Sequence, residues 1–219
     1  MLPLRDNNPT KNFPVVTLLI IIINVAVFFC TLLLSKNEYQ AVVFQYGFAP
    51  RELFGATNIA GWALAAEKMV SSMFLHSGFW HLALNMLFLW IFGDNIEDIT
   101  GPFRFIIFYL ICGIAACLLQ AAMDINSATP MIGASGAISG VLGGYLVKFP
   151  RASILTWLII FIVRLPAYAV LILWFVIQIF RATQGNHGGV AYLAHIGGFV
   201  AGMLLIKLFE KKGRVKRHL

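Results

Sequence analysis

Long uncharged stretches constrain the fold of this chain more than any other feature of its sequence. Of its 219 residues, 60% are hydrophobic and only 11% are charged, which is unusual for a soluble domain. A transmembrane helix needs about 20 mainly apolar residues. We therefore predict an all-α, polytopic membrane protein with a bundle of six transmembrane helices. Five uncharged runs follow Lys11 (to Ser35), Lys68 (to Gly93), Arg104 (to Met123), Asp124 (to Val147) and His187 (to Ile206). A sixth run lies between Ala152 and Phe180 and is broken only by Arg164 and Pro166.

The positions of the basic residues predict how these helices are oriented. Six spans place both termini on one side of the membrane. That side receives every Lys and Arg except Lys36, Arg51, Lys68 and Arg181. Because Lys and Arg accumulate in cytoplasmic segments, we expect both termini in the cytoplasm.

Three parts of unequal size are expected along the chain. Residues 1–12 form a short cytoplasmic N-terminus, 13–208 the membrane domain and 209–219 a basic tail. We interpret the tail as an anchor for the last helix, with no nucleic acid as partner. The longest connection, residues 36–68, falls outside and mixes aromatic with polar residues, which favours short interfacial helices. A transporter would show paired repeats, and the sequence contains none.

The fourth apolar run predicts a short helix inside the membrane. Its first part, "DINSATPMIG", is polar and contains proline and glycine, so a helix is expected only from about Ser135 to Lys148. Such a helix is roughly 20 Å long, whereas the hydrocarbon core is about 30 Å thick. Irregular backbone at membrane depth is tolerated only beside protein or a water-filled cavity. We therefore expect Ser135 to begin this helix below the outer surface, next to a cavity.

Three polar residues are predicted to lie at the same depth. Ser135, His81 and His195 each precede the charged end of their helix by about 13 residues, or roughly 20 Å. Glycines also form stripes on two of these helices. Because small residues on one face let helices approach closely in lipid, the stripes are expected to bring Ser135 and His195 together. The stripes are Gly136, Gly140 and Gly143 on the fourth helix, and Gly198 and Gly202 below His195 on the sixth.

These residues have the chemistry of a serine hydrolase. A serine hydroxyl is a weak nucleophile without an adjacent base, and a neutral histidine is the usual partner. No Asp or Glu lies at their depth, which favours a Ser135–His195 dyad. Acyl transfer also needs donors at the developing oxyanion. The Ser135 amide at a helix start and the i, i+4 pair His81 and Asn85 are candidate donors.

Each of these residues also has a plainer explanation. A serine in "GASG" packs between helices, an intramembrane histidine is often a satisfied polar group, and Asn85 could bond across helices. Metal binding by His76, His81 and His195 is a further alternative. The sequence contains no HExxH motif, no cysteine set and no carboxylate at that depth, so we expect no metal and no cofactor.

Four ordered segments resemble the rhomboid family of intramembrane serine proteases, in its bacterial six-helix form. They are "HSGFWHLALNM", "GDNIEDITG", "GASGAISGVLGG" and "AHIGGFVAG". The resemblance implies Ser135 as nucleophile and His195 as general base and then acid. It further implies oxyanion-side residues (His81, Asn85 and the backbone near Ala134), supporting residues (His76, Gly133, Gly136, Ser139 and Gly198) and structural residues (Glu97, Gly101 and Gly202).

The same resemblance implies an activity and a place in the cell. It implies an endopeptidase that cleaves transmembrane segments of membrane proteins, in a bacterial plasma membrane, from an active site open to the outer face. The alternative is a non-catalytic rhomboid-like factor that binds membrane proteins. The lipid bilayer is a second partner, and the oligomeric state stays open.

Two positions depart from patterns found in some members of the family. Glu67 and Lys68 stand where those members have Trp-Arg in the outer loop. Ser139 stands where some have a tyrosine that stacks on the catalytic histidine. Two candidates for orienting His195 therefore remain, namely Ser139, one turn below Ser135, and Tyr192, about one turn above His195.

Overall fold

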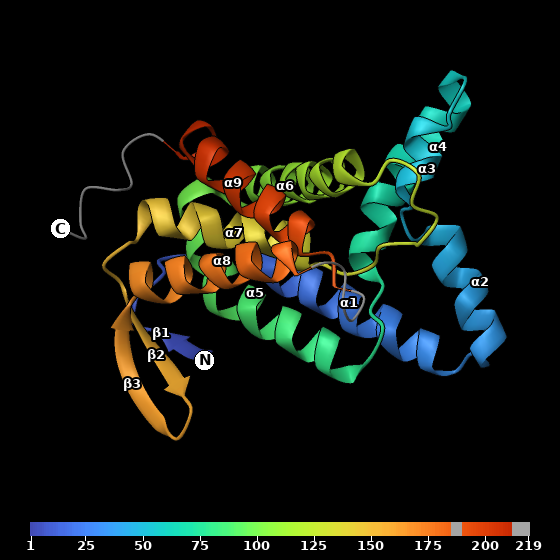
Figure 1. The fold of residues 1–219 in the computed structure, drawn as a ribbon. Helices are drawn as coiled ribbons and strands as arrows, with labels where there is room; N and C mark the ends of the chain where they lie inside the picture. The colour runs from blue at the N-terminus through green and yellow to red at the C-terminus, as the bar shows by residue number, and fades with distance from the viewer. Residues whose placement is uncertain (185–189, 212–219) are drawn as a thin grey trace.

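Six helices form the body of the protein in the computed structural model, which describes residues 1–184 and 190–211. They run between two ends that differ in structure (Figure 1). A small sheet covers one end, and three short helices form the other. The six helices are α1 (Val15–Leu32), α5 (Phe79–Thr100), α6 (Pro102–Met123), α7 (Ser135–Lys148), α8 (Ala167–Thr183) and α9 (Tyr192–Phe209).

The helices have the composition of membrane spans. Within the described residues, α1, α6 and α9 are each long and apolar enough to cross a membrane. The segment Ile59–Phe74 joins α5 in an apolar pair bent by 90°, and α8 is a shorter apolar helix. Large apolar side chains are exposed on the outside of the bundle, including Ile22, Phe103 and Leu204. Such a surface suits lipid rather than water, and the mostly helical membrane fold predicted from the sequence is confirmed.

The short helix α7 lies inside the bundle. It begins at Ser135 and ends at Lys148, as predicted, and every residue from Ala137 to Tyr145 is buried. A Cβ on Gly198 would overlap the carbonyl of Gly136, and a Cβ on Gly202 would overlap that of Gly140. Helices α7 and α9 are therefore in backbone contact along their glycine stripes.

The connection of residues 36–68 folds into short helices, as expected. They are α2 (Lys36–Tyr46), α3 (Pro50–Phe54) and α4 (Ile59–Ser71), followed by the 3₁₀ turn η1 (Ser72–Phe74). The buried Lys68 ties them together, because its Nζ donates to the Phe44 carbonyl (2.9 Å) and to Glu52 Oε1 (2.5 Å).

A β-hairpin replaces the first half of the fifth apolar run. The run from Ala152 to Phe180 was predicted as one span, but β2 (Ser153–Leu158) and β3 (Phe161–Pro166) form a hairpin and α8 begins only at Ala167. Pro166 lacks an N–H and would interrupt a helix, and the β-branched and aromatic residues before it favour strands. The turn places Ile159 at φ 58°, the positive φ that tight hairpins require.

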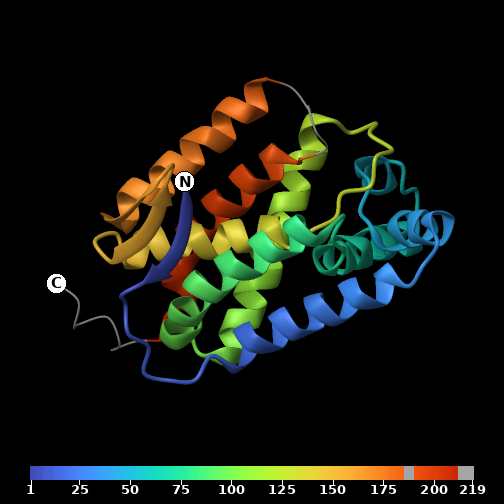
Figure 2. The same ribbon diagram turned by 90° about the horizontal axis from the view of Figure 1, so that it is seen from below.

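The N-terminus completes this sheet. Strand β1 (Leu2–Asp6) pairs antiparallel with β2, with Asp6 opposite Ile154. The sheet was not predicted, because residues 1–12 were expected to form only a short cytoplasmic N-terminus and residues 152–180 a single span. Figure 2 shows that the sheet and the short outer helices lie at opposite ends of the bundle and that α9 lies between α8 and α6.

Candidate active site

Ser135 is held in place by the irregular segment that precedes it. Met131 pairs with Phe48 of the outer loop through two backbone hydrogen bonds, and the Gly133 amide donates to the Ser72 carbonyl (2.9 Å). Gly133 has φ +124°, a conformation that L side chains rarely adopt. A Cβ there would also lie 2.7 Å from His81 Nε2. Glycine is therefore required just before the turn that presents Ser135 at the first position of α7.

Ser135 and His195 are in hydrogen-bond contact. The Ser135 Oγ lies 2.8 Å from His195 Nε2. His195 lies in the first turn of α9, and the contact between the glycine stripes brings the starts of α7 and α9 together. The juxtaposition expected from equal depth is therefore present in the structure.

The second nitrogen of His195 contacts Gln178, which was not predicted as a site residue. Its Nδ1 lies 2.9 Å from Oε1 of Gln178, which is buried on α8. Ser139 instead donates to the Ser135 carbonyl (2.6 Å), and Tyr192 meets the His195 ring edge-on at 6.2 Å between centroids. The sequence does contain an indication of this role, because Gln178 is the lone polar residue in the apolar stretch "LWFVIQIF" and a polar group in such a run needs a partner.

His81 lies close to Gly133, two residues before Ser135. The Ser77 amide points at His81 Nδ1 (3.4 Å), and the Ser77 hydroxyl lies 3.0 Å from the same atom. An acceptor role for Nδ1 leaves the proton on Nε2. This atom faces Gly133, where a Cβ would be 3.8 Å from Ser135 Oγ. His81 Nε2–H is therefore directed to the space beside the serine hydroxyl.

Asn85 and His76 both contact His81. Asn85 is buried and donates one Nδ2 proton to the His81 carbonyl (3.0 Å), which leaves the second proton of that amide for another acceptor. His76 is buried, and its ring meets the His81 ring edge-on at 5.0 Å. Neither ring nitrogen of His76 has a hydrogen-bond partner among the described residues, while its carbonyl accepts from Tyr39 (3.2 Å).

The remaining motif residues have structural contacts. Ala134 is the buried N-cap of α7, and its carbonyl accepts from Ile138. Glu97 is buried and accepts three hydrogen bonds at the start of α1, from the amides of Val16 (2.9 Å) and Thr17 (2.7 Å) and from the Thr17 hydroxyl (2.8 Å). Gly101 turns the chain from α5 into α6 at φ +80°. Glu97 thus joins α5 to the N-terminus of α1, where a carboxylate also complements the helix dipole.

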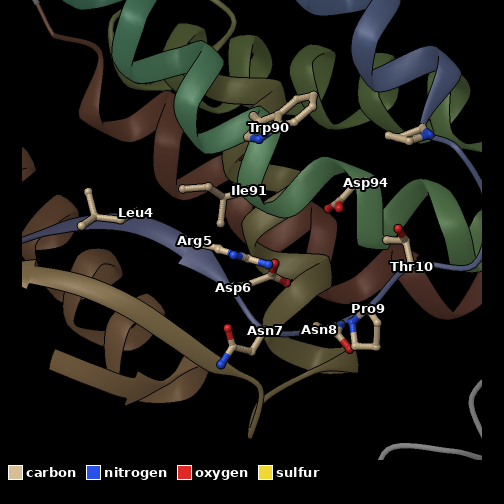
Figure 3. A pocket seen from close by; sticks show the side chains of 11 residues that line it. Leu4, Arg5, Asp6, Asn7, Asn8, Pro9, Thr10, Trp90, Ile91 and Asp94 are labelled. Atoms are coloured by element: carbon tan, nitrogen blue, oxygen red, sulfur yellow. The ribbon is translucent and has the colours of Figure 1, made fainter. Parts of the chain in front are cut away.

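A separate pocket lies at the far end of α7 from Ser135. It has a volume of about 400 Å³ and lies between the N-terminal segment and α5, with Asp6 and Asp94 in its wall (Figure 3). Asp6 accepts from Tyr145 (2.7 Å) and Asn95 (3.0 Å), and burial raises its pKa above the usual 3.8. In the described part of the chain, no three His, Cys, Asp or Glu side chains are grouped to hold a metal ion.

Comparisons with known proteins agree with the arrangement of these motifs. Residues 64–212 match the Rhomboid domain family. The chain is 32% identical over 215 residues to the rhomboid protease AarA of Providencia stuartii, covering 86% of this chain and 70% of that protein. It is 35% identical over 148 residues to the mitochondrial Rhomboid protein 1 of Saccharomyces cerevisiae, covering 63% of this chain but only 40% of the yeast protein.

A shorter match points to the same group of proteins. The chain is 40% identical over 79 residues to the rhomboid protease GluP of Bacillus subtilis, covering 36% of this chain and 15% of that protein. The family match covers more than half of the chain and includes both Ser135 and His195. The chain therefore belongs to the rhomboid family.

Proposed function

We propose that this protein is an intramembrane serine endopeptidase that uses Ser135 and His195 as a catalytic dyad. The observation that carries the proposal is the 2.8 Å contact between Ser135 Oγ and His195 Nε2 at the start of a buried helix. Two relatives, AarA and GluP, are named as rhomboid proteases, which supports a peptidase.

The first half of the reaction forms an acyl-enzyme. His195 Nε2 accepts the Ser135 proton while Oγ attacks the scissile carbonyl carbon of the substrate. The tetrahedral intermediate collapses when the protonated His195 donates to the leaving amine, which departs with the C-terminal part of the substrate. A water molecule, deprotonated by His195, then hydrolyses the ester and regenerates Ser135.

The oxyanion is stabilised by candidate donors that lie close to Ser135. The Ser135 amide lies at the N-terminus of α7, where backbone N–H groups have no partner within the helix and the dipole favours negative charge. His81 Nε2–H is directed to the same space, and the second Nδ2 proton of Asn85 can follow. Preorganised donors of this kind are worth about 3–4 kcal/mol each in transition-state energy.

The substrates are membrane proteins, cleaved in or near their transmembrane segments. A scissile carbonyl within an intact helix is already hydrogen-bonded, so a substrate segment must unwind locally before Ser135 attacks. Residues that weaken helices near the cleavage site should therefore favour cleavage. We place the protein in a bacterial plasma membrane, as the resemblance to the bacterial six-helix form implies. We place both termini in the cytoplasm, because the basic residues cluster on the side of the termini.

A fluorophosphonate probe tests the proposal without knowledge of the natural substrate. The wild-type protein in liposomes should be labelled at Ser135, and both Ser135→Ala and His195→Ala should abolish labelling. Ser127→Ala, in the segment before α7, serves as a matched control and should be labelled normally. The same variants are then compared for cleavage of a panel of tagged single-span helices. Labelling or cleavage that survives Ser135→Ala would overturn the dyad, and a folded wild type without either activity would favour the non-catalytic binding factor.

A further inference from the structure

Gln178 contacts the catalytic histidine from a neighbouring helix. Its side chain projects from α8, is only 7% exposed, and places Oε1 2.9 Å from His195 Nδ1. Its Nε2 lies 3.3 Å from the carbonyl of Trp174, one turn earlier on α8. Both ends of the buried amide are thus engaged, one by the histidine ring and one by the backbone of its own helix.

The contact with Trp174 determines which way the amide faces. A backbone carbonyl only accepts, so the Gln178 nitrogen must point at Trp174 and the oxygen at His195. An amide oxygen only accepts as well, so the proton of a neutral His195 must lie on Nδ1. Nε2 is then left as the acceptor, which is the form that can remove the proton of Ser135.

We propose that Gln178 is a positioning residue that fixes the tautomer and the ring orientation of His195 for proton transfer with Ser135. The inference rests on the proposed dyad and adds a third member to it. In serine proteases with a triad, a carboxylate in this position holds the imidazole in its correct tautomer. A neutral amide supplies the same acceptor without burying a charge at membrane depth, where an ionised side chain is costly.

The aromatic neighbours of His195 do not replace this bond. The Trp174 ring lies 6.0 Å from the His195 ring with a tilt of 32°, and the Tyr192 ring is edge-on at 6.2 Å. These contacts limit how far the imidazole tilts. They do not distinguish its two nitrogens, whereas a hydrogen bond to Nδ1 does.

Two substitutions at Gln178 separate the loss of the acceptor from the loss of the side chain. Gln178→Met keeps the length and removes the acceptor, whereas Gln178→Glu keeps an acceptor oxygen toward Nδ1. Gln184→Met, at the exposed C-cap of the same helix, is the matched control. Thermal unfolding in detergent establishes that each variant is folded before it is assayed.

Inactivation by a fluorophosphonate then gives a rate constant (kinact) and an affinity (KI) for each variant. We expect Gln178→Met to lower kinact about 10- to 100-fold, a part of what general acid–base catalysis contributes, with KI unchanged. Gln178→Glu should recover most of kinact, and Gln184→Met should match the wild type. A loss that appears mainly in KI would overturn the proposal, because it would indicate a binding rather than a positioning role.

The ¹⁵N chemical shifts of His195 provide a test that does not depend on activity. The wild type and Gln178→Glu should show a protonated Nδ1, and Gln178→Met should show a mixture of tautomers. Wild-type kinact together with an unchanged tautomer in Gln178→Met would refute the role of Gln178 while leaving the dyad intact. Labelling that survives Ser135→Ala would instead refute the dyad, so the two failures are distinguishable.

Discussion

Adding one methyl group at Gly202 should disrupt the candidate active site from a distance. The Cβ of Gly202→Ala would lie 2.7 Å from Gly140 Cα and even closer to the Gly140 carbonyl oxygen. Carbon atoms prefer separations of about 3.5–4.0 Å, so α7 and α9 must move apart by about 1 Å. The obstacle is backbone, which cannot rotate away as a side chain can.

The separation should affect both stability and the rate of reaction. Overpacking costs about 1–3 kcal/mol, partly offset by the gain of about 1 kcal/mol when alanine replaces glycine in a helix. The same movement would lengthen the 2.8 Å contact between Ser135 and His195 to about 3.5 Å or more, beyond a good hydrogen bond. A misplacement of about 1 Å in reacting groups can reduce the rate about 100-fold.

Gly144→Ala provides the matched control. Its Cβ on α7 would meet the side-chain ends of Phe108 and Ile206 at 3.2–3.4 Å, which can adjust by a few tenths of an ångström. Fluorophosphonate labelling rates and thermal unfolding in detergent are measured for both variants. Gly202→Ala should be slow and destabilised, and Gly144→Ala should resemble the wild type. Equal labelling and equal stability of Gly202→Ala and the wild type would refute the close contact of α7 and α9 as the cause of the dyad geometry.

Three further predictions concern residues outside the dyad. Glu97→Gln should lower the free energy of unfolding by about 1–3 kcal/mol, because an amide nitrogen would then face donors such as Thr17 at the start of α1. Chemical unfolding in detergent measures this change in stability. Burial raises the pKa of Asp6, so the wild type should lose stability relative to Asp6→Asn as pH rises from about 4 through the folded-state pKa. Thermal unfolding between pH 4 and 8 should show that the difference in stability between the two proteins closes at acidic pH. A difference that does not change with pH would contradict this prediction. Lys68→Met should leave Glu52 without its ion pair and speed proteolysis of the outer loop, whereas equal cleavage rates for the two proteins would argue against that role.

The helical framework and the proximity of Ser135 to His195 could be predicted from local features of the sequence. The polar segment before Ser135 predicted the start of α7, and this start is observed. The similar distances of Ser135 and His195 from charged helix ends predicted a common depth, and the two side chains are in contact. Both arguments work because a helix advances by a constant rise per residue, so sequence distance converts directly into depth.

The hairpin in residues 153–166 shows where this reasoning fails. A continuous apolar run fits a buried strand and a membrane helix equally well, and length alone favoured the helix. Arg164 and Pro166 interrupt the run, but whether they end a helix or belong to a strand depends on which segment packs beside residues 153–166. Strand β1 provides that neighbour, and its pairing with β2 joins residues that are about 150 positions apart in the sequence.

Sequence alone therefore determined the membrane class, the short helix α7 and the common depth of Ser135 and His195, because helical rise and hydrophobic length act locally. Only the tertiary structure decided which polar partners they meet. Gln178 lies 17 residues before His195 on another helix, and the rotation of α8 against α9 selects the face that it presents. Likewise, Glu97 bonds to Thr17 across 80 residues because α5 packs against the start of α1. Such pairings depend on how helix surfaces fit together, and the spacing along the chain does not specify that fit.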